Sequence, residues 1–161
     1  MTKVKKFGPP RIKKISGGKD PTRLVEEFIV RRGFEPDECL RQRTSDVSTW
    51  CAPLSEDEEL EITLEGLTRP METTLYMGLN VLTVPIKNCE RFLAAALIVA
   101  DRLIGAKLSL VNYDFVLSVT AYLGDKGIEE IDYFYELVTR QKLWVHDEIV
   151  QEAMKEDFDR E

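Results

Sequence analysis

The only histidine of the chain, His146, lies beside two carboxylates in the segment LWVHDEIVQE. A histidine next to Asp147 and Glu148 suggests a general base or a metal ligand. The apolar spacing of the segment predicts a helix, however, and adjacent side chains on a helix point in different directions. We therefore expect His146 to be solvent-exposed, unpaired with Asp147, and short of the ligands that a metal site needs.

Carboxylates form a second candidate site between residues 56 and 61. They are Glu56, Asp57, Glu58, Glu59 and Glu61. Glycoside hydrolysis needs two carboxyl groups of different pKa in one cleft, whereas these lie on a predicted turn and on the exposed side of a predicted strand. The run also lacks the spacing and the glycine of an EF-hand. The sequence predicts a solvated cluster, with a basic segment of a protein partner as its alternative ligand.

The three cysteines, Cys39, Cys51 and Cys89, are far apart in the sequence and have no histidine nearby. They match neither a zinc site nor a cysteine–histidine nucleophile. Gly17-Gly18-Lys19 lacks the spacing of a phosphate-binding loop. The sequence thus predicts no catalytic, cofactor-binding or metal-ligating residue. Unpaired thiols, and no apolar signal segment in residues 1–19, predict a cytoplasmic location.

Charge divides the chain into two parts. The net charge is −7, yet residues 1–19 carry seven cations and no acid, so the rest of the chain carries −14. With Pro9-Pro10 and Gly17-Gly18, this segment is predicted to be a flexible basic arm in front of a single domain over residues 20–157. Its candidate contacts with nucleic acid or an anionic membrane are Lys3, Lys5, Lys6, Arg11, Lys13 and Lys14. The alternatives are a solvated arm and an arm that folds onto its own acidic domain.

Hydrophobic periodicity predicts the elements of that domain. A helix begins at Asp20-Pro21 and ends near Gly33, and a last helical segment begins near Ile128, either as one long helix or as two. Strands are expected over 45–52, 58–65 and 73–84, a helix over 88–104, and two strands around Leu108 and Phe115–Ala121. This order, α-βββ-α-ββ-α, predicts an α+β fold whose antiparallel five-stranded sheet has helices packed on one face.

The apolar run RFLAAALIVADR, residues 91–102, is too short to span a membrane. Its helical spacing places apolar residues in two adjacent stripes. The first stripe is Phe92, Ala96, Val99 and Leu103, and the second is Leu93, Leu97, Ala100 and Ile104. Two such stripes predict a core helix that is buried over most of its circumference, with the wall of a ligand pocket as the alternative.

The face of the sheet that the helices leave open is the predicted contact surface. Strand alternation assigns to it Glu59, Glu61, Thr63, Glu65, Tyr76, Leu82, Tyr122 and Trp50. Mixed aromatic and acidic side chains suit contact with a protein. Trp144, on the last helix, falls off the predicted core stripe and is a further aromatic candidate. The candidate protein-binding residues are therefore Trp50, Glu59, Glu61, Tyr76, Tyr122 and Trp144.

The segment LTVPIKNCERFLAAALIVADRLIGAKLSLVNYDFVLSVTAYL, residues 82–123, resembles the bacterial sensory-transduction-regulator family called YbjN. LVEEFIVRRGFEP, residues 24–36, resembles the first helix of that family. The resemblance implies the fold of type III secretion chaperones, homodimers and a protein-binding, noncatalytic function, and it carries over no site residue. We thus predict a chaperone, adaptor or regulatory module. The alternatives are a regulator that binds nucleic acid or membrane through its arm, and a small-ligand-binding domain.

Overall fold

A computed structural model of the protein describes residues 20–124 and 126–155. The predicted arm, with its candidate contacts from Lys3 to Lys14, lies outside the described residues. The helices are α1 (Pro21–Arg31), α2 (Pro36–Cys39), the 3-10 turn η1 (Pro70–Glu72), α3 (Cys89–Asp101) and α4 (Ile128–Ala153). The strands are β1 (Leu40–Arg43), β2 (Val47–Pro53), β3 (Glu59–Glu65), β4 (Thr74–Thr83), β5 (Lys107–Val111) and β6 (Asp114–Tyr122).

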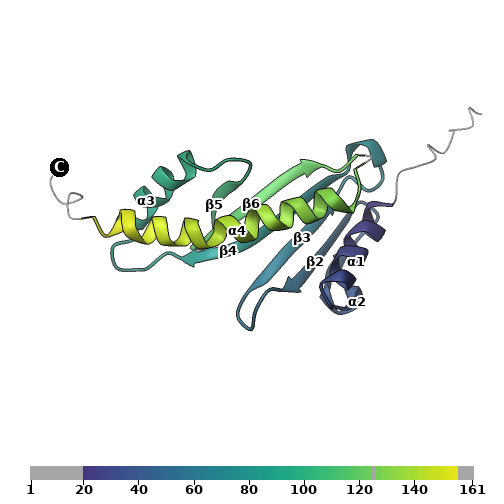
Figure 1. Ribbon diagram of the computed structural model, residues 1–161, viewed down its shortest axis with the longest axis horizontal. Coiled ribbons are helices and arrows are strands. Elements are labelled where there is room, and N and C mark those ends of the chain that lie inside the picture. Colours follow the sequence, from purple (N-terminus) through teal and green to yellow (C-terminus); the bar gives the residue numbers. More distant parts are fainter. Residues whose placement is uncertain (1–19, 125, 156–161) are drawn as a thin grey trace, which may run out of the picture.

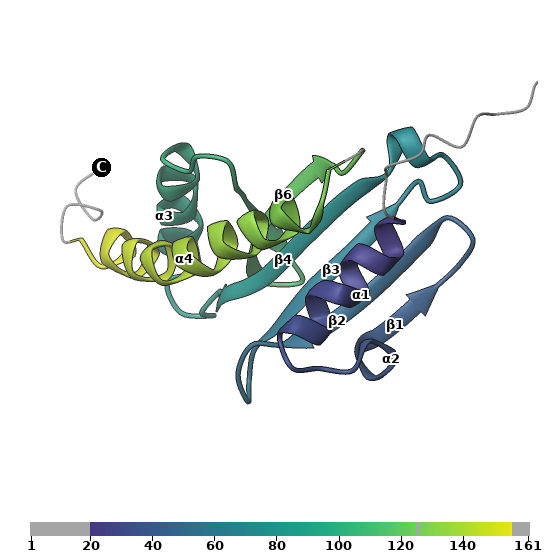
Figure 2. The ribbon, with the colours of Figure 1, turned by 45° about the vertical axis from the view of Figure 1, so that its right-hand side comes forward.

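The strands form one sheet in the order β1-β2-β3-β4-β6-β5, and every neighbouring pair is antiparallel. Helices α1 and α4 lie on one face of this sheet, and α3 packs against the C-terminal half of α4 (Figures 1 and 2). This confirms the predicted α+β class with helices beside an antiparallel sheet. No helix in the described part of the chain is long and apolar enough to cross a membrane.

The sheet has six strands, so the predicted count of five is wrong. The missing strand is β1, whose sequence LRQR has a single apolar residue and therefore no alternation to detect. β1 is a short edge strand that pairs with β2 alone. Its position next to β2 follows from the turn between them, where the hydroxyl of Thr44 accepts a hydrogen bond from the amide of Val47.

Helix α1 forms where the sequence predicts it. The Asp20 carboxylate accepts a hydrogen bond from the amide of Thr22 at 3.0 Å, and Pro21 occupies the first helical position, where no amide hydrogen is needed. Four apolar side chains at helical spacing are buried against the sheet and α4: Leu24, Val25, Phe28 and Ile29. Burial of each contributes about 1.5–3 kcal/mol.

The covered face of the sheet is a continuous apolar layer. Across the strands, Trp50 lies opposite Ile62, Ile62 opposite Met77, and Met77 opposite Val119. Trp50 is fully buried, with 0% of its surface exposed, so the prediction that it lies on the open face is wrong. In β2, Ser48, Trp50 and Ala52 point to one side and Val47, Thr49 and Cys51 to the other. The two sides have similar polarity, so the sequence pattern does not show which side faces the core.

A register shift in β4 changes a second assignment. Strand pairing with β6 is irregular between Asn80 and Leu82, which brings Leu82 opposite Phe115. Phe115 is a core residue, and Leu82 is partly buried against the core. The prediction that Leu82 lies on the open face is therefore wrong, because an irregular register moves the following side chains to the other face.

Helix α3 is buried on one side only. Its first predicted stripe packs into the core, with Phe92, Ala96 and Val99 buried. Its second stripe is only partly covered: Leu93 packs against the core, whereas Leu97 is 74% exposed, and Ile104, just beyond the helix, is 84% exposed. The prediction of a helix buried over most of its circumference is wrong, because no other element of the described chain covers that side.

Candidate protein-binding surface

The open face of the sheet brings together four of the predicted residues: Glu59, Glu61, Tyr76 and Tyr122. Thr63 lies opposite both Thr49 and Tyr76, and the two threonine hydroxyls are hydrogen-bonded at 2.9 Å. In the next row towards the β2–β3 turn, Glu61 lies opposite both Cys51 and Gly78. Residues of facing strands in one row share a face. The open face is thus a polar layer with aromatic side chains.

Tyr76 is the centre of this face. Its ring lies along the strand over Gly78, because a Cβ atom at that glycine would come within 2.2 Å of the Tyr76 hydroxyl oxygen. The hydroxyl is hydrogen-bonded to Ser118 of β6. Burial, and secondly the negative charge of Glu61, raise the pKa of the Tyr76 phenol, while the Ser118 hydrogen bond opposes them. Tyr76 is thereby fixed flat against the sheet.

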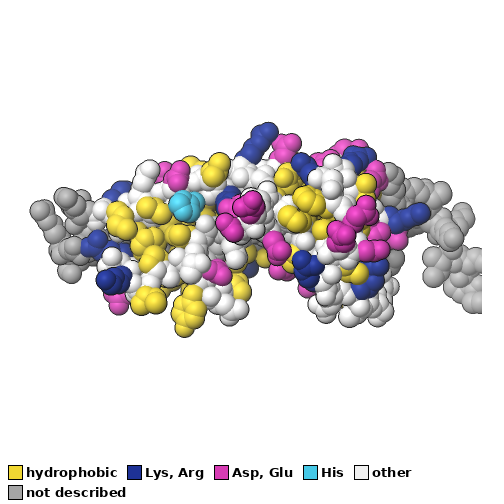
Figure 3. All heavy atoms as spheres, turned by 90° about the horizontal axis from the view of Figure 1, so that it is seen from below, with side chains coloured by type: hydrophobic (Ala, Val, Ile, Leu, Met, Phe, Trp, Pro, Cys, Tyr) yellow, Lys and Arg dark blue, Asp and Glu magenta, His cyan; other side chains and the backbone are white. Residues whose placement is uncertain are grey.

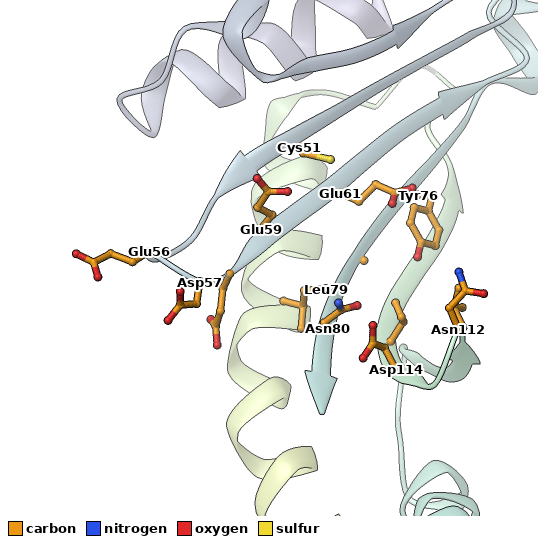
Figure 4. Close-up of a pocket in the computed structure, with 14 residues that line it drawn as sticks. Cys51, Glu56, Asp57, Glu59, Glu61, Tyr76, Leu79, Asn80, Asn112 and Asp114 are labelled. Carbon is orange, nitrogen blue, oxygen red and sulfur yellow. The ribbon is translucent and has the colours of Figure 1, made fainter. Parts of the chain in front are cut away.

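A groove of about 630 Å³ begins at Tyr76 and runs towards the β2–β3 turn. Figure 4 shows Glu59 and Glu61 of β3 beside Cys51, with Tyr76 and Asn80 of β4 next to them and Asp114 across the groove. Its acidic lining residues are Glu56, Asp57, Glu58, Glu59, Glu61 and Asp114. Glu58 pairs with Lys142 of α4, and Glu56 points away from the cavity (Figure 4). The groove is therefore an acidic hollow on the open face.

A second hollow, of about 310 Å³, continues the face beyond Tyr76. Its lining residues are Glu61, Thr63, Glu65, Thr74, Tyr76 and Thr120. Tyr122 lies opposite Thr74 at this end of the sheet and is 68% exposed. The two hollows share Glu61 and Tyr76, so they form one track along β3 and β4.

Sequence reasoning missed Asn112 and Asp114, which also line the groove. Asn112 lies in the turn between β5 and β6, where Asn112 and Tyr113 adopt left-handed φ angles of 49° and 69°, and Asp114 is the first residue of β6. The Thr83 hydroxyl donates a 2.6 Å hydrogen bond to Asp114 and fixes that carboxylate at the end of β4. The two strands that flank the turn were predicted, but the place of the turn beside β4 depends on β6 pairing with β4, which no local pattern shows.

Trp144 lies elsewhere. It is partly exposed on α4, whereas the open face is on the other side of the sheet. Figure 3 shows hydrophobic side chains around the histidine on the half of this view nearer the C-terminus, and more acidic side chains on the other half. The predicted binding residues therefore divide into four on the open face, one on α4 and one, Trp50, in the core.

His146 makes a contact that the sequence did not predict. Its Nδ1 lies 3.1 Å from the Asp147 Oδ1 atom, so the expectation that these neighbours do not pair is wrong. Both side chains are largely exposed on α4, and neither contacts a nucleophile in the described residues. Within the described part of the chain, no three His, Cys, Asp or Glu side chains are grouped to hold a metal ion.

The cysteines occupy three different surroundings. Cys39 is buried, Cys51 is half-buried on the groove wall, and Cys89 begins α3. Burial is the main cause that raises the pKa of the Cys39 and Cys51 thiols, and nearby Glu59 adds to it. A raised pKa lowers the thiolate fraction, which makes these two thiols poor nucleophiles at neutral pH.

A second, apolar surface lies between α3 and β5. It forms a groove of about 240 Å³ lined by Leu93, Ala96, Leu97, Ala100, Leu108, Ser109, Leu110 and Phe115. β5 is an edge strand, so one side of its backbone has no strand partner. An uncovered apolar groove beside an open strand edge is typical of an interface with another chain.

Comparison with known proteins gives a likeness of fold. No family model matches the sequence, and no curated protein matches it. The chain is similar to a chain of the ExsC–ExsE complex, with a TM-score of 0.52 and 16% identity over 78% of this chain and 90% of that chain. It is similar to one of the HopA1–SchA chaperone–effector complex, with a TM-score of 0.51 and 12% identity over 78% and 91%.

A third similar structure is the Yersinia pestis type III secretion chaperone SycH in complex with a fragment of YscM2, with a TM-score of 0.49, 12% identity and coverages of 77% and 98%. The first two likenesses show that this chain shares the α+β fold of the matched chains in those two complexes. The resemblance to the YbjN family stays a prediction.

Proposed function

We propose that this protein is a noncatalytic protein-binding module, of the chaperone or adaptor type, that binds an extended segment of another protein. The observation that carries the proposal is the open sheet face, where Tyr76 and Tyr122 lie beside a track of hollows that no helix covers. The fold supports it, because similar chains occur in a chaperone–effector complex. A regulatory role of the YbjN type is the finer version of this proposal.

The track suits an extended peptide better than a compact ligand. It follows β3 and β4 through two connected hollows, the larger of about 630 Å³. The exposed ring of Tyr122 and the half-buried ring of Tyr76 provide contact area with few rotatable bonds, and aromatic side chains are frequent binding hot spots. Glu59 and Glu61 add acceptors for amide or cationic donors of the segment.

A catalytic role has little support in the described residues. Among the described residues, the polar partner of His146 is the exposed Asp147, and the lining of the acidic groove contains no histidine or cation. The thiol that lines the groove, Cys51, has a raised pKa because of its burial. We therefore propose a binding protein rather than an enzyme. Three free thiols favour a reducing, cytoplasmic compartment.

We further propose that the protein is a homodimer that covers the second stripe of α3. Leu97 and Ile104 are the most exposed large apolar side chains of that region. The groove between α3 and β5 also supports the alternative of a small apolar ligand. The other alternative, binding of nucleic acid or membrane by residues 3–14, rests on the sequence alone. A second copy is favoured because the uncovered stripe continues along an open strand edge.

The test selects displayed random peptides on the wild-type protein and then measures their affinities for two variants. In the first variant, Tyr76→Ser is combined with Tyr122→Ser. We expect at least about tenfold weaker binding, because a lost hot spot costs more than about 1.4 kcal/mol. The control is Tyr133→Ser, an exposed tyrosine on α4. Equal loss in the control, or no loss in the first variant, would exclude the open face as the binding site.

A further inference from the structure

The open face has a one-sided charge. The four central strands, β2, β3, β4 and β6, contain no lysine or arginine, whereas β3 alone contributes Glu59, Glu61 and Glu65 to this face. Within residues 20–124 and 126–155, Glu61 and Glu65 form no ion pair, and Glu59 has one contact of 3.8 Å with Arg41. The face therefore presents a row of carboxylates that the described chain leaves almost unpaired.

The spacing of this row is that of an extended chain. Glu59 and Glu61 are two residues apart on one strand, so their side chains stand about 7 Å from each other. A basic segment in an extended conformation repeats with the same period. The first nineteen residues contain two such pairs, Lys3 with Lys5 and Arg11 with Lys13.

The length and attachment point of that segment allow it to reach the row. Figures 1 and 2 show the start of α1 close to η1. The last residue of β3, Glu65, precedes η1 by a short loop and lies at the same end of the sheet. From Glu65 to Glu59, β3 extends about 20 Å, and a segment of nineteen residues spans up to about 60 Å when extended. The segment is therefore long enough to pass around the sheet end and follow β3.

We propose that residues 3–14 of this chain bind along the acidic open face of their own sheet. Single exposed ion pairs are weak, but several pairs on a tethered segment benefit from a high effective concentration. The docking itself is independent of the function proposed above. Its consequence rests on that function: the segment competes with a partner for Glu61 and Tyr76, so the free protein covers its own binding face.

The experiment is zero-length carbodiimide cross-linking of full-length protein, which joins lysines to carboxylates in direct contact. An equimolar mixture of unlabelled and nitrogen-15-labelled protein separates links within a chain from links between chains. We expect same-isotope links from lysines of residues 3–14 to Glu59, Glu61 or Glu65. Their yield should fall several-fold between about 50 mM and 0.5 M salt, because salt screens exposed charges.

A pair of matched variants provides a second readout, the rate at which trypsin cleaves after Lys13 and Lys14. The triple variant Glu59→Gln, Glu61→Gln and Glu65→Gln should be cleaved several-fold faster than the wild type. The control variant carries Glu90→Gln, Asp101→Asn and Glu129→Gln, three exposed acids of α3 and α4. It should be cleaved at the wild-type rate.

Three results would overturn the proposal. The first is links that are mixed-isotope as often as same-isotope, the share that random pairing of chains in an equimolar mixture gives, which would assign the segment to a second copy. The second is links spread equally over the acids of α3 and α4. The third is protection from trypsin that occurs only with added nucleic acid or anionic vesicles. Neither readout involves a partner. If the selected peptides do not bind the open face, the proposed function is rejected and the docking of residues 3–14 is unaffected. If the cross-links and the trypsin protection fail, the docking is rejected and the proposed function is unaffected.

Discussion

The two faces of the sheet are built from the same strands and differ in almost every property. On the covered face, Ile62 lies between Trp50 and Met77, and all three are fully buried. On the open face, the neighbouring residue Glu61 lies between Cys51 and Gly78 at the wall of a groove. The covered face therefore forms part of the apolar core, whereas the open face presents carboxylates to solvent.

The largest expected effect tests that division on one strand. Ile62→Ala should lower the free energy of unfolding by about 2–5 kcal/mol, because it leaves a cavity in the apolar layer. Glu61→Ala, one residue away, should change it by less than about 0.5 kcal/mol, as surface substitutions usually do. Urea unfolding of both variants measures the difference. Similar losses would mean that the open face is also part of the stable core.

Helix α3 has an apolar side that the described chain leaves partly exposed. Leu97→Asp should weaken self-association by about 30-fold or more, since an unpaired charge buried in an interface costs at least about 2 kcal/mol. The fold should survive, because Leu97 is mainly exposed. Sedimentation measurements over a concentration series determine the dimer dissociation constant.

The control for α3 is Val30→Asp on α1, where the side chain is also exposed. This variant should associate like the wild type. A wild-type protein that stays monomeric at high concentration would contradict the proposed dimer and leave the α3 groove without its occupant.

A group of ion pairs links Arg102, the residue that caps the end of α3, to α4, beside the buried apolar side chains Val99 and Ile149. Arg102 lies 3.2 Å from both Glu148 and Glu152, and Lys155 contacts Glu152 at 2.7 Å. The hydrogen bond from Lys155 is the largest cause that lowers the pKa of Glu152. A lowered folded-state pKa stabilises the fold above the unfolded-state pKa, and this contribution is lost as the pH falls through the folded-state value.

Glu152→Gln should therefore destabilise the protein at pH 7 by less than Ile62→Ala does. The difference from the wild type should shrink at an acidic pH below the folded-state pKa, where the wild-type carboxyl is protonated. Urea midpoints at the two pH values measure this change. A difference that stays constant with pH would assign the effect to packing of the side chain rather than to its charge.

The sequence predicted the two faces where the alternation of side chains is strong. In β3, Leu60, Ile62 and Leu64 alternate with acids or threonine, and the structure confirms that all three are buried. In β2 the contrast between sides is weak, and Trp50 was assigned to the wrong face. The irregular pairing beyond Asn80 then reversed Leu82, which a two-residue period cannot predict.

Other features depend on contacts between distant segments. β1 is defined by its pairing with β2 rather than by its own composition. Asp114 joins the acidic groove because β6 inserts between β4 and β5, so that residues far apart in sequence meet. The second stripe of α3 has the composition of a core stripe, and only the three-dimensional packing shows that nothing in the described chain covers it.

The smallest expected effect concerns the charge of the open face. Burial and the carboxylate of Glu61 both raise the pKa of the Tyr76 phenol, burial being the larger cause. Glu61→Gln removes the charge and keeps the shape, so the pKa of Tyr76 should fall but stay above the ordinary tyrosine value. Carbon-13 NMR of labelled tyrosine, titrated at low and high salt, measures the change. The contrary result is a pKa of Tyr76 that does not move, while the Ile62→Ala variant shows its full loss of stability. The two faces would then differ in packing alone. The negative potential that would attract a basic segment would be too weak to act at Tyr76.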